Sequence, residues 1–301
     1  MFKDFRFQSN DGISDAYAVK WIPKDKPKYI LQIAHGMAEH VMRYEDFAKF
    51  LNKHGFLVCG EDHLGHGRTA AKKEDLGYCA KKDGHKIVVR DMNKLYEIIS
   101  KEYPGLPYFL LGHSMGSFLC REYIETFGDT LNGAIVMGTG AQPSALLAVA
   151  KTLAKTIEKF KGDHHRSELL NNMAVGSYNK KFKPIVTGHE WLCRDSKQAD
   201  RYQGDPYCGY VFTVNGFYNM FDTIDFIQKK ANINKIPKDL PIFICAGDMD
   251  PVGNYGKAPK SVYNAYQKAG IKDVTLKLYP EDRHEILNEL DQDQVYDDLL
   301  Q

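Results

Sequence analysis

The sequence lacks three features that would narrow the search for a function. It has no run of 18 apolar residues and no Cys-x-x-Cys pair, and its 40 Lys and Arg residues are balanced by 39 Asp and Glu residues. We therefore expect no membrane span, and the small net charge argues against nucleic acid as a partner. The charged N-terminus leads into no apolar stretch, so we expect no cleaved secretory signal.

Six cysteines are present, and their spacing does not suggest a disulfide framework. Cys59 and Cys245 lie within apolar, strand-like runs, where a free thiol packs as a small hydrophobic group. A chain of 301 residues buries enough surface to fold without a covalent or metal crosslink. We therefore expect reduced, structural cysteines and a cytoplasmic location.

The length of the chain predicts two domains, or one large α/β domain that carries an insertion. Strand-like and helix-like segments alternate up to about residue 140 and again after residue 230, which predicts a parallel sheet with helices on both faces. The expected strands are residues 15–22, 29–34, 56–59, 108–111, 134–137, 242–246 and 274–278. The expected helices of this core are residues 43–54, 87–99, 115–126, 257–269 and a C-terminal segment from residue 291.

The alternation stops between residues 141 and 229, a stretch too long for an unstructured loop in a compact domain. Residues 178–226 alone hold 11 of the 36 aromatic residues, which need a surface to cover. We expect residues 141–229 to form a helical cap over a core made of residues 1–140 and 230–301.

Two questions about this cap remain open at the level of the sequence. Residues 144–160 predict a helix whose apolar stripe would pack against the main domain or, alternatively, dip into a lipid surface. The aromatic residues would line a slot for an acyl chain or fill the cap's own core. The stripe comprises Leu146, Val149, Ala150, Leu153, Ile157 and Phe160, and the aromatic residues include Tyr178, Trp191, Tyr207, Phe212 and Phe217.

A Gly-x-Ser-x-Gly sequence, Gly112 to Gly116, joins an expected strand to an expected helix. Composition alone predicts only about 0.07 such matches in a chain of this kind. A nucleophile on a tight strand-to-helix turn needs small residues two positions away on each side, because the helix passes close to the strand. Ser114 is therefore the candidate nucleophile.

A serine nucleophile requires a base, and the base requires an acid that orients it. His284 follows the last expected strand and is the only one of the eleven histidines downstream of the insertion. Asp248 and Asp250 both follow the strand before it, so either residue is a candidate acid. The order Ser, Asp, His is the order of an α/β hydrolase.

Acyl transfer also needs two hydrogen-bond donors for the negatively charged oxygen of the tetrahedral intermediate. One donor is expected to be the backbone amide of Met115, which directly follows the serine. The other is expected in the loop after the strand at residues 29–34, where Met37 is available.

Histidines and carboxylates in two further loops raise the alternative of a metal site. These residues are His35, His40, Glu61, Asp62, His63 and His66. Neither His-Glu-x-x-His nor another recognised ligand spacing occurs. Gly65 and Gly67 lack the third glycine and the acid of a dinucleotide site. We therefore expect no metal and no cofactor.

Several of these motifs together resemble the α/β hydrolases of the monoacylglycerol lipase and lysophospholipase group, also described as serine-aminopeptidase-like. The resemblance covers nearly the whole chain. It is carried by residues 35–40 with 43–44, 62–67, 112–116, 250–253, 283–285 with 288–289, and the cap segments 191–195 and 205–209.

The resemblance implies an α/β-hydrolase fold with a mostly parallel eight-stranded sheet and a cap. It also implies Ser114 as nucleophile, His284 as base and Asp250 as the orienting acid, with Met37 and Met115 as oxyanion donors. Ser117 and the pair Arg68-Thr69 depart from the mammalian members, which weakens the transfer of substrate detail.

We expect a cofactor-independent serine carboxylester hydrolase that acts on small lipid esters, such as a monoacylglycerol or lysophospholipid, through an acyl-enzyme intermediate. The expected partner is this substrate, with no stable membrane insertion and at most a transient contact through the cap. An aminopeptidase-like serine peptidase, with Glu190, Asp195, Asp200 or Asp205 holding a free amino terminus, is the alternative within the same fold. A ligand-binding module without catalysis is the alternative from another class.

Overall fold

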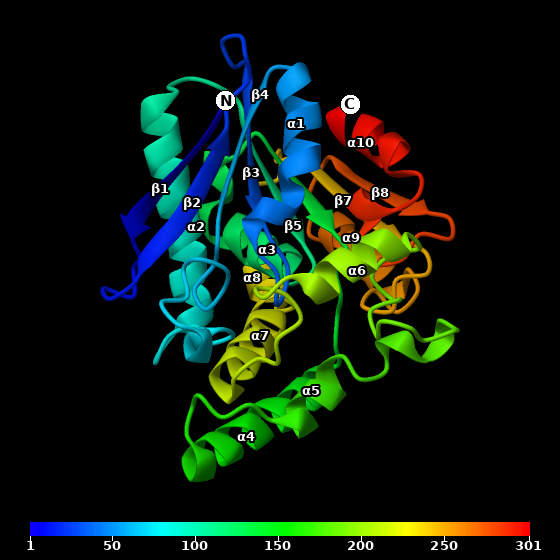
Figure 1. The fold of residues 1–301 in the computed structure, drawn as a ribbon. Helices are drawn as coiled ribbons and strands as arrows, with labels where there is room; N and C mark the ends of the chain where they lie inside the picture. The colour runs from blue at the N-terminus through cyan, green and yellow to red at the C-terminus, as the bar shows by residue number, and fades with distance from the viewer.

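The computed structural model describes residues 1–301 and contains a single eight-stranded sheet. The strand order is β1-β2-β4-β3-β5-β6-β7-β8, and β1 and β2 pair antiparallel with their neighbours while the other strands are parallel (Figure 1). The strands are β1 Phe2–Gln8, β2 Asp15–Trp21, β3 Tyr29–Ala34, β4 Phe56–Glu61, β5 Tyr108–His113, β6 Gly133–Met137, β7 Ile242–Gly247 and β8 Val274–Tyr279. The predicted mostly parallel sheet is thereby confirmed.

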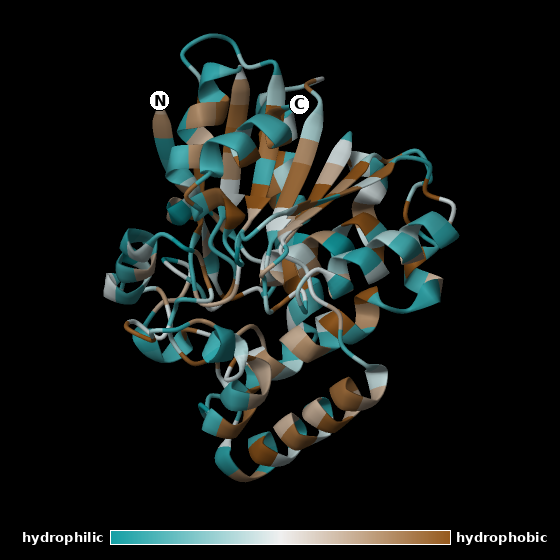
Figure 2. Ribbon diagram, turned by 90° about the vertical axis from the view of Figure 1, so that its right-hand side faces the viewer, coloured by the Kyte–Doolittle hydropathy of each residue, from teal (hydrophilic) through white to brown (hydrophobic).

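Helices cover both faces of the sheet, as predicted. Side chains alternate between the faces along each strand, so that Leu110 packs with α2, α3 and α9, whereas Leu111 packs with α1 and α10. Both faces are covered, and the strands are accordingly hydrophobic along most of their length (Figure 2). These helices are α1 Glu45–Lys53, α2 Gly84–Glu102, α3 Met115–Phe127, α9 Lys257–Lys268 and α10 Gln292–Leu300, with short 3-10 helices at Val41–Tyr44, Lys73–Asp75, Gly128–Thr130, Tyr178–Lys181 and Ile286–Asn288.

No strand lies between β6 and β7, where the sequence predicts an insertion. This stretch holds α4 Ser144–Lys161, α5 Glu168–Ala174, α6 Ser196–Gly204, α7 Val214–Ile227 and α8 Lys230–Ile233. Helix α7 packs directly on α2 and α3, and α4 packs on the outside of α7 (Figure 1). The exact division into core and cap stays a prediction, since α7 contributes to the core of the main domain.

The apolar stripe predicted for α4 does not pack as a unit against the main domain. Leu146, Val149 and Phe160 are 47%, 61% and 78% exposed, and the buried residues are Leu147, Ala150 and Ala154. Packing against the main domain, the first of the two interpretations of this stripe, is therefore wrong for these three side chains. Lys151, which lies off the stripe, instead faces α7. There the Lys151 ammonium pairs with Asp222 at 3.1 Å and Asp225 at 2.7 Å.

The sequence analysis did not predict β1, although residues 5–8 alternate aromatic and polar side chains. Only Phe7 of this strand is buried, because β1 lies at the edge of the sheet and pairs with β2 alone. None of the helices has the length and apolar composition required to span a membrane.

Candidate active site

Ser114 stands alone between β5 and α3, in a conformation that non-glycine residues rarely adopt. Its φ is 55° and its ψ is −121°. The Ser117 amide donates a hydrogen bond of 2.9 Å to the Ser114 carbonyl, and the Ser117 hydroxyl donates a second one. A serine held this way at the end of a parallel strand is the strained turn that exposes a nucleophile in α/β hydrolases.

The two flanking glycines are required by the close approach of α3 to the sheet. A Cβ atom on Gly112 would lie 2.1 Å from the Gly116 carbonyl oxygen, and one on Gly116 would lie 2.0 Å from the Ala34 carbonyl oxygen. Neither backbone segment can move away, because both are part of the packed core. The prediction that these positions must be small is confirmed.

His284 and Asp250 meet at the same edge of the sheet. The His284 Nδ1 lies 2.9 Å from the Asp250 Oδ2, and both side chains are buried. The second oxygen of Asp250 accepts a hydrogen bond of 2.8 Å from the Val252 amide. Asp248, the competing acid, instead accepts the Glu281 amide at 2.8 Å. Of the two candidates, Asp250 alone contacts the imidazole.

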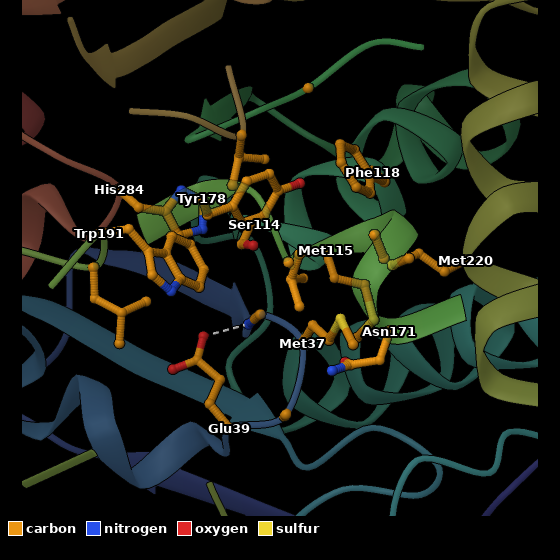
Figure 3. A pocket seen from close by; sticks show the side chains of 18 of the residues that line it. Met37, Glu39, Ser114, Met115, Phe118, Asn171, Tyr178, Trp191, Met220 and His284 are labelled. Carbon is orange, nitrogen blue, oxygen red and sulfur yellow. Dashed lines mark hydrogen bonds between the residues drawn. The ribbon is translucent and has the colours of Figure 1, made fainter. Parts of the chain in front are cut away.

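One cavity brings the predicted nucleophile and base together. Ser114 and His284 both line it, and the His284 Nε2 is buried without a hydrogen-bond partner (Figure 3). The imidazole is held between the indole of Trp191, with ring centres 5.0 Å apart, and the ring of His113, at 4.8 Å. The Nε2 atom is therefore available to a group inside the cavity, while Nδ1 is engaged by the carboxylate.

The two predicted oxyanion donors line the same cavity. A Cβ atom on Gly36 would lie 3.0 Å from the Ser114 Cβ, so the loop that carries Met37 runs directly beside the nucleophile. Neither the Met37 amide nor the Met115 amide donates a hydrogen bond to another protein group. These are the properties expected of amides that serve a bound oxygen.

Residues 25–291 of the chain match the serine aminopeptidase S33 family. The chain belongs to this family.

Relatives of this S33 hydrolase include ester hydrolases from several organisms. A monoacylglycerol lipase of Mycolicibacterium smegmatis is 27% identical over 97% of this chain and 94% of its own length. A monoglyceride lipase of Mus musculus is 27% identical over 90% of this chain and 80% of its own length. The crystal structure of a thermostable carboxyl esterase from Bacillus coagulans, in complex with glycerol, is 33% identical, covers 99% of this chain and 96% of that one, and has a TM-score of 0.91.

These comparisons confirm the resemblance inferred from the motifs and identify an ester hydrolase with the α/β-hydrolase fold.

A buried ionic network in this S33 hydrolase connects the loop of Met37 to the loop of His284. The Arg43 guanidinium contacts both carboxylate oxygens of Glu285, at 2.7 and 2.8 Å, and also pairs with Glu39. Burial alone would raise the pKa of Glu39, but Arg43 and His113 hold it well below its usual range. Glu39 is therefore a carboxylate, and it accepts the Gly36 amide in the loop next to Ser114 (Figure 3).

The same network reaches the backbone of His284. The Tyr44 hydroxyl donates to Glu39 at 2.8 Å and lies 3.0 Å from the His113 Nδ1. Burial would lower the pKa of His113, but Glu39 raises it above its usual value, so its Nε2–H donates to the His284 carbonyl at 3.2 Å. The sequence analysis named Arg43, Tyr44 and Glu285 as motif residues without a role. Their connection depends on contacts that the spacing does not reveal.

Hydrogen bonds and ion pairs connect the segment around Trp191 to the loop that carries His284. The Glu285 amide donates to the Leu192 carbonyl at 2.6 Å. The Arg194 guanidinium pairs with Glu289 at 2.8 Å, with Asp291 at 2.6 Å and with Asp282. Three carboxylates whose oxygens lie within 4.8 Å of one another thus surround an arginine side chain.

The cavity has a volume of about 400 Å³, and 21 of its 35 lining residues are hydrophobic. Of the aromatic residues expected to line an acyl slot, Tyr178 and Trp191 do so. Phe212 and Phe217 are fully buried in the main core, and Tyr207 is 39% exposed beside His40. The aromatic residues of the insertion therefore divide between the cavity, the core and the surface.

The residues considered for a metal do not converge as one ligand set. The rings of His35, His63 and His66 contact one another at tilted or perpendicular angles, with the His35 and His63 ring centres 4.2 Å apart, whereas His40 lies apart and bonds Asp205 at 2.9 Å. Glu61 lies 3.4 Å from His63, but burial raises the pKa of Glu61 to about 8 and lowers that of His63 to about 4. Both groups are therefore neutral near pH 6.

Gly65, considered above for a dinucleotide site, packs against the Tyr78 backbone, which explains its lack of a side chain.

Proposed function

We propose that Ser114 is the nucleophile of this ester hydrolase, with His284 as the general base and acid and Asp250 as the residue that orients the imidazole. The Ser114 oxygen attacks the ester carbonyl while its proton passes to the His284 Nε2. The tetrahedral intermediate collapses to an acyl-enzyme, and the imidazolium gives its proton to the departing alcohol. Water, deprotonated by the same imidazole, then releases the fatty acid.

One observation carries this proposal. The imidazole whose Nδ1 is bonded to Asp250 turns an unpartnered Nε2 toward the cavity that Ser114 also lines. The amides of Met37 and Met115 are assigned to the oxyanion, since they border the cavity and have no protein acceptor. The Asp250 oxygen accepts the Nδ1–H of His284, which leaves Nε2 unprotonated and able to take the serine proton.

The proposed substrate is an ester of a fatty acid with a small alcohol, such as a monoacylglycerol. In the view of Figure 3, Phe118 and Met220 lie on one side of Ser114, and Trp191 and Glu39 lie on the other. Leu147 of α4 and Phe221 of α7 also line the cavity, and such apolar side chains suit an acyl chain. The monoglyceride lipases among the relatives support the same class of substrate.

A serine peptidase that holds a free amino terminus is less well supported. The four carboxylates available for that purpose do not line the cavity, and three of them already have partners. Glu190 accepts the amides of Val186 and Thr187, Asp195 caps α6, and Asp205 pairs with His40.

The exposed residues of α4 support a transient contact with a lipid surface. Leu146 of α4 and Met173 of α5 are both exposed and both border the cavity, so the apolar patch adjoins the route to Ser114. Val149 and Phe160 extend this patch along α4, next to Lys159 and Lys161. A substrate dissolved in a lipid surface could enter without crossing water.

We also place the protein in the cytoplasm. All six cysteines are free, and the buried ones, such as Cys59 and Cys245, pack as hydrophobic groups. This is the usage expected in a reducing compartment.

The test is turnover of a short-chain nitrophenyl ester by the Ser114→Ala variant. We expect a loss of about 10⁴-fold or more in kcat, together with loss of labelling by a fluorophosphonate probe. Ser261→Ala is the matched control, since Ser261 is exposed on α9 and does not line the cavity. Full activity of Ser114→Ala would contradict the assignment.

A further inference from the structure

The buried side chain of His35 contacts the loop that carries Met37, although the mechanism gives His35 no proton to move. Its Nδ1 lies 2.8 Å from the carbonyl oxygen of Gly36, and its Nε2 lies 3.0 Å from the backbone nitrogen of His63. The side chain is completely buried, and its ring lies against the rings of His63 and His66 in tilted orientations. The imidazole therefore has two fixed contacts, one to the active-site loop and one to the loop after β4.

These contacts determine which nitrogen carries the proton. A backbone N–H can only donate, so the His35 Nε2 must be the acceptor of the His63 amide and holds no hydrogen. The hydrogen of the neutral ring is consequently on Nδ1, where it is donated to the Gly36 carbonyl. Burial keeps the pKa of His35 well below its usual value, so this arrangement persists at the pH values at which the enzyme would work.

The Gly36 carbonyl and the Met37 amide belong to the same peptide group. In a planar trans peptide the C=O and N–H bonds point in opposite directions, so fixing one fixes the other. The amide of Gly36 is held separately by the Glu39 carboxylate. A Cβ atom on Gly36 would lie 2.6 Å from that carboxylate and 3.0 Å from the Ser114 Cβ, which leaves this loop little room to shift.

We propose that His35 is a positioning residue for the oxyanion hole: by donating its Nδ1–H to the Gly36 carbonyl, it sets the direction of the Met37 amide toward the tetrahedral intermediate. This inference rests on the proposed function, because it presupposes an oxyanion at Ser114. The contribution of His35 belongs to the transition state, since an ester carbonyl gains its negative charge only after attack.

Two substitutions separate the two contacts of the imidazole. Asn places its amide nitrogen near the position of Nδ1, so His35→Asn keeps a donor for Gly36 but loses the contact with His63. Gln places its amide group near the position of Nε2, so His35→Gln keeps the contact with His63 but loses the donor. His66→Asn removes a neighbouring buried imidazole that bonds the Leu64 carbonyl and does not line the cavity, and it is the matched control.

We expect His35→Gln to lower kcat about ten- to a hundredfold with little change in KM, which is less than the loss from removing an oxyanion donor altogether. A boronic acid, which forms a tetrahedral adduct with the serine, should lose affinity by a similar factor. His35→Asn should recover most of both losses, and His66→Asn should affect melting temperature rather than kcat. Wild-type kcat and boronate affinity in His35→Gln, or equal losses in both His35 variants, would overturn the proposal.

A measurement on the unaltered enzyme covers the case in which His35→Gln does not fold. The nitrogen chemical shifts of the His35 ring should show a protonated Nδ1 and an unprotonated Nε2 at neutral pH. A proton on Nε2 instead would overturn the assignment. Failure of the proposed function would give a different result, because the Ser114→Ala variant would then turn over the ester at the wild-type rate.

Discussion

The two sides of the cavity are built in different ways. Ser114, Met37 and His284 lie on short loops at the ends of parallel strands, and buried ion pairs and close-packed glycines hold these loops. The opposite side is formed by α4, α5 and α7 of the insertion, where Leu146 and Met173 are partly open to solvent. We call the first the rigid side and the second the variable side, and we expect the reaction to depend on the rigid side and the choice of substrate on the variable side.

The largest expected effect concerns the rigid side. Asp250→Asn should lower kcat about 10³- to 10⁴-fold with a short nitrophenyl ester, because the imidazole loses the carboxylate that fixes its tautomer. Asp248→Asn should stay within about twofold, since an amide oxygen still accepts the Glu281 N–H. A large loss in Asp248→Asn with full activity in Asp250→Asn would reverse the assignment of the acid.

The contact of α7 with α2 and α3 should contribute to stability in a way that depends on pH. His85 of α2 pairs with Glu122 of α3 at 2.8 Å and with Asp222 of α7 at 3.3 Å. Burial would lower the pKa of His85, but hydrogen bonds to Asp222 and Glu122 raise it to about 9. This stabilisation is complete below the unfolded pKa of about 6.5 and is lost as the pH rises through 9.

We therefore expect the free energy of unfolding of the wild-type protein to contain a term of about 3 kcal/mol that disappears between pH 6 and pH 10. His85→Gln should lack this pH-dependent term, whereas replacing the exposed His54 by Gln should leave it in place. Urea unfolding at both pH values measures it. If the free energy of unfolding changes equally with pH in the wild-type protein and in His85→Gln, the ion pairs of His85 do not stabilise the packing of α7 on the core.

A larger side chain on the variable side of the cavity should change which acyl chains are accepted and leave the rate of hydrolysis of short esters unchanged. Met220→Trp places a larger side chain into the cavity, so kcat/KM for an ester with a 12- to 16-carbon acyl chain should fall about ten- to fiftyfold, while the acetate ester is little affected. Tyr218→Trp, on the same helix but outside the cavity, is the control. Equal losses for long and short esters would argue against an acyl site beside Met220.

The smallest effect is expected at the exposed patch of α4. Replacing Val149 and Phe160 together by Ser should weaken sedimentation with phosphatidylcholine vesicles about three- to tenfold, because two apolar side chains no longer enter the lipid surface. Turnover of a water-soluble ester should be unchanged. Ile13→Ser, which alters another exposed apolar residue, should leave vesicle binding as it is. Unchanged binding by the double variant would exclude this patch.

The sequence was sufficient to predict the rigid side because its residues follow strands in a recognisable order. The strand at 29–34 was predicted with its observed bounds, and the positions of Ser114 and His284 followed from the strands before them. The strand order left Asp248 and Asp250 open, because both residues follow β7, and only the family resemblance implied Asp250. In the structure Asp250 contacts His284, whereas Asp248 accepts the Glu281 amide.

The variable side was harder to predict because its structure depends on partners far away in the chain. The periodicity of α4 indicates an apolar stripe, but part of that stripe is exposed, and Lys151, which lies off the stripe, pairs with Asp222 and Asp225 of α7. No local pattern indicates that Trp191 packs on the imidazole of His284. The roles of Arg43 and His35 were likewise hidden, since both act through buried contacts with other loops.

A crystal structure of the enzyme after reaction with a fluorophosphonate tests the central claim most directly. We predict phosphorus bonded to the Ser114 Oγ, the phosphonyl oxygen within hydrogen-bond distance of the Met37 and Met115 amides, and the His284 Nε2 facing the adduct. Phosphorus bonded to another residue, or an imidazole of His284 turned away from Ser114, would contradict the account.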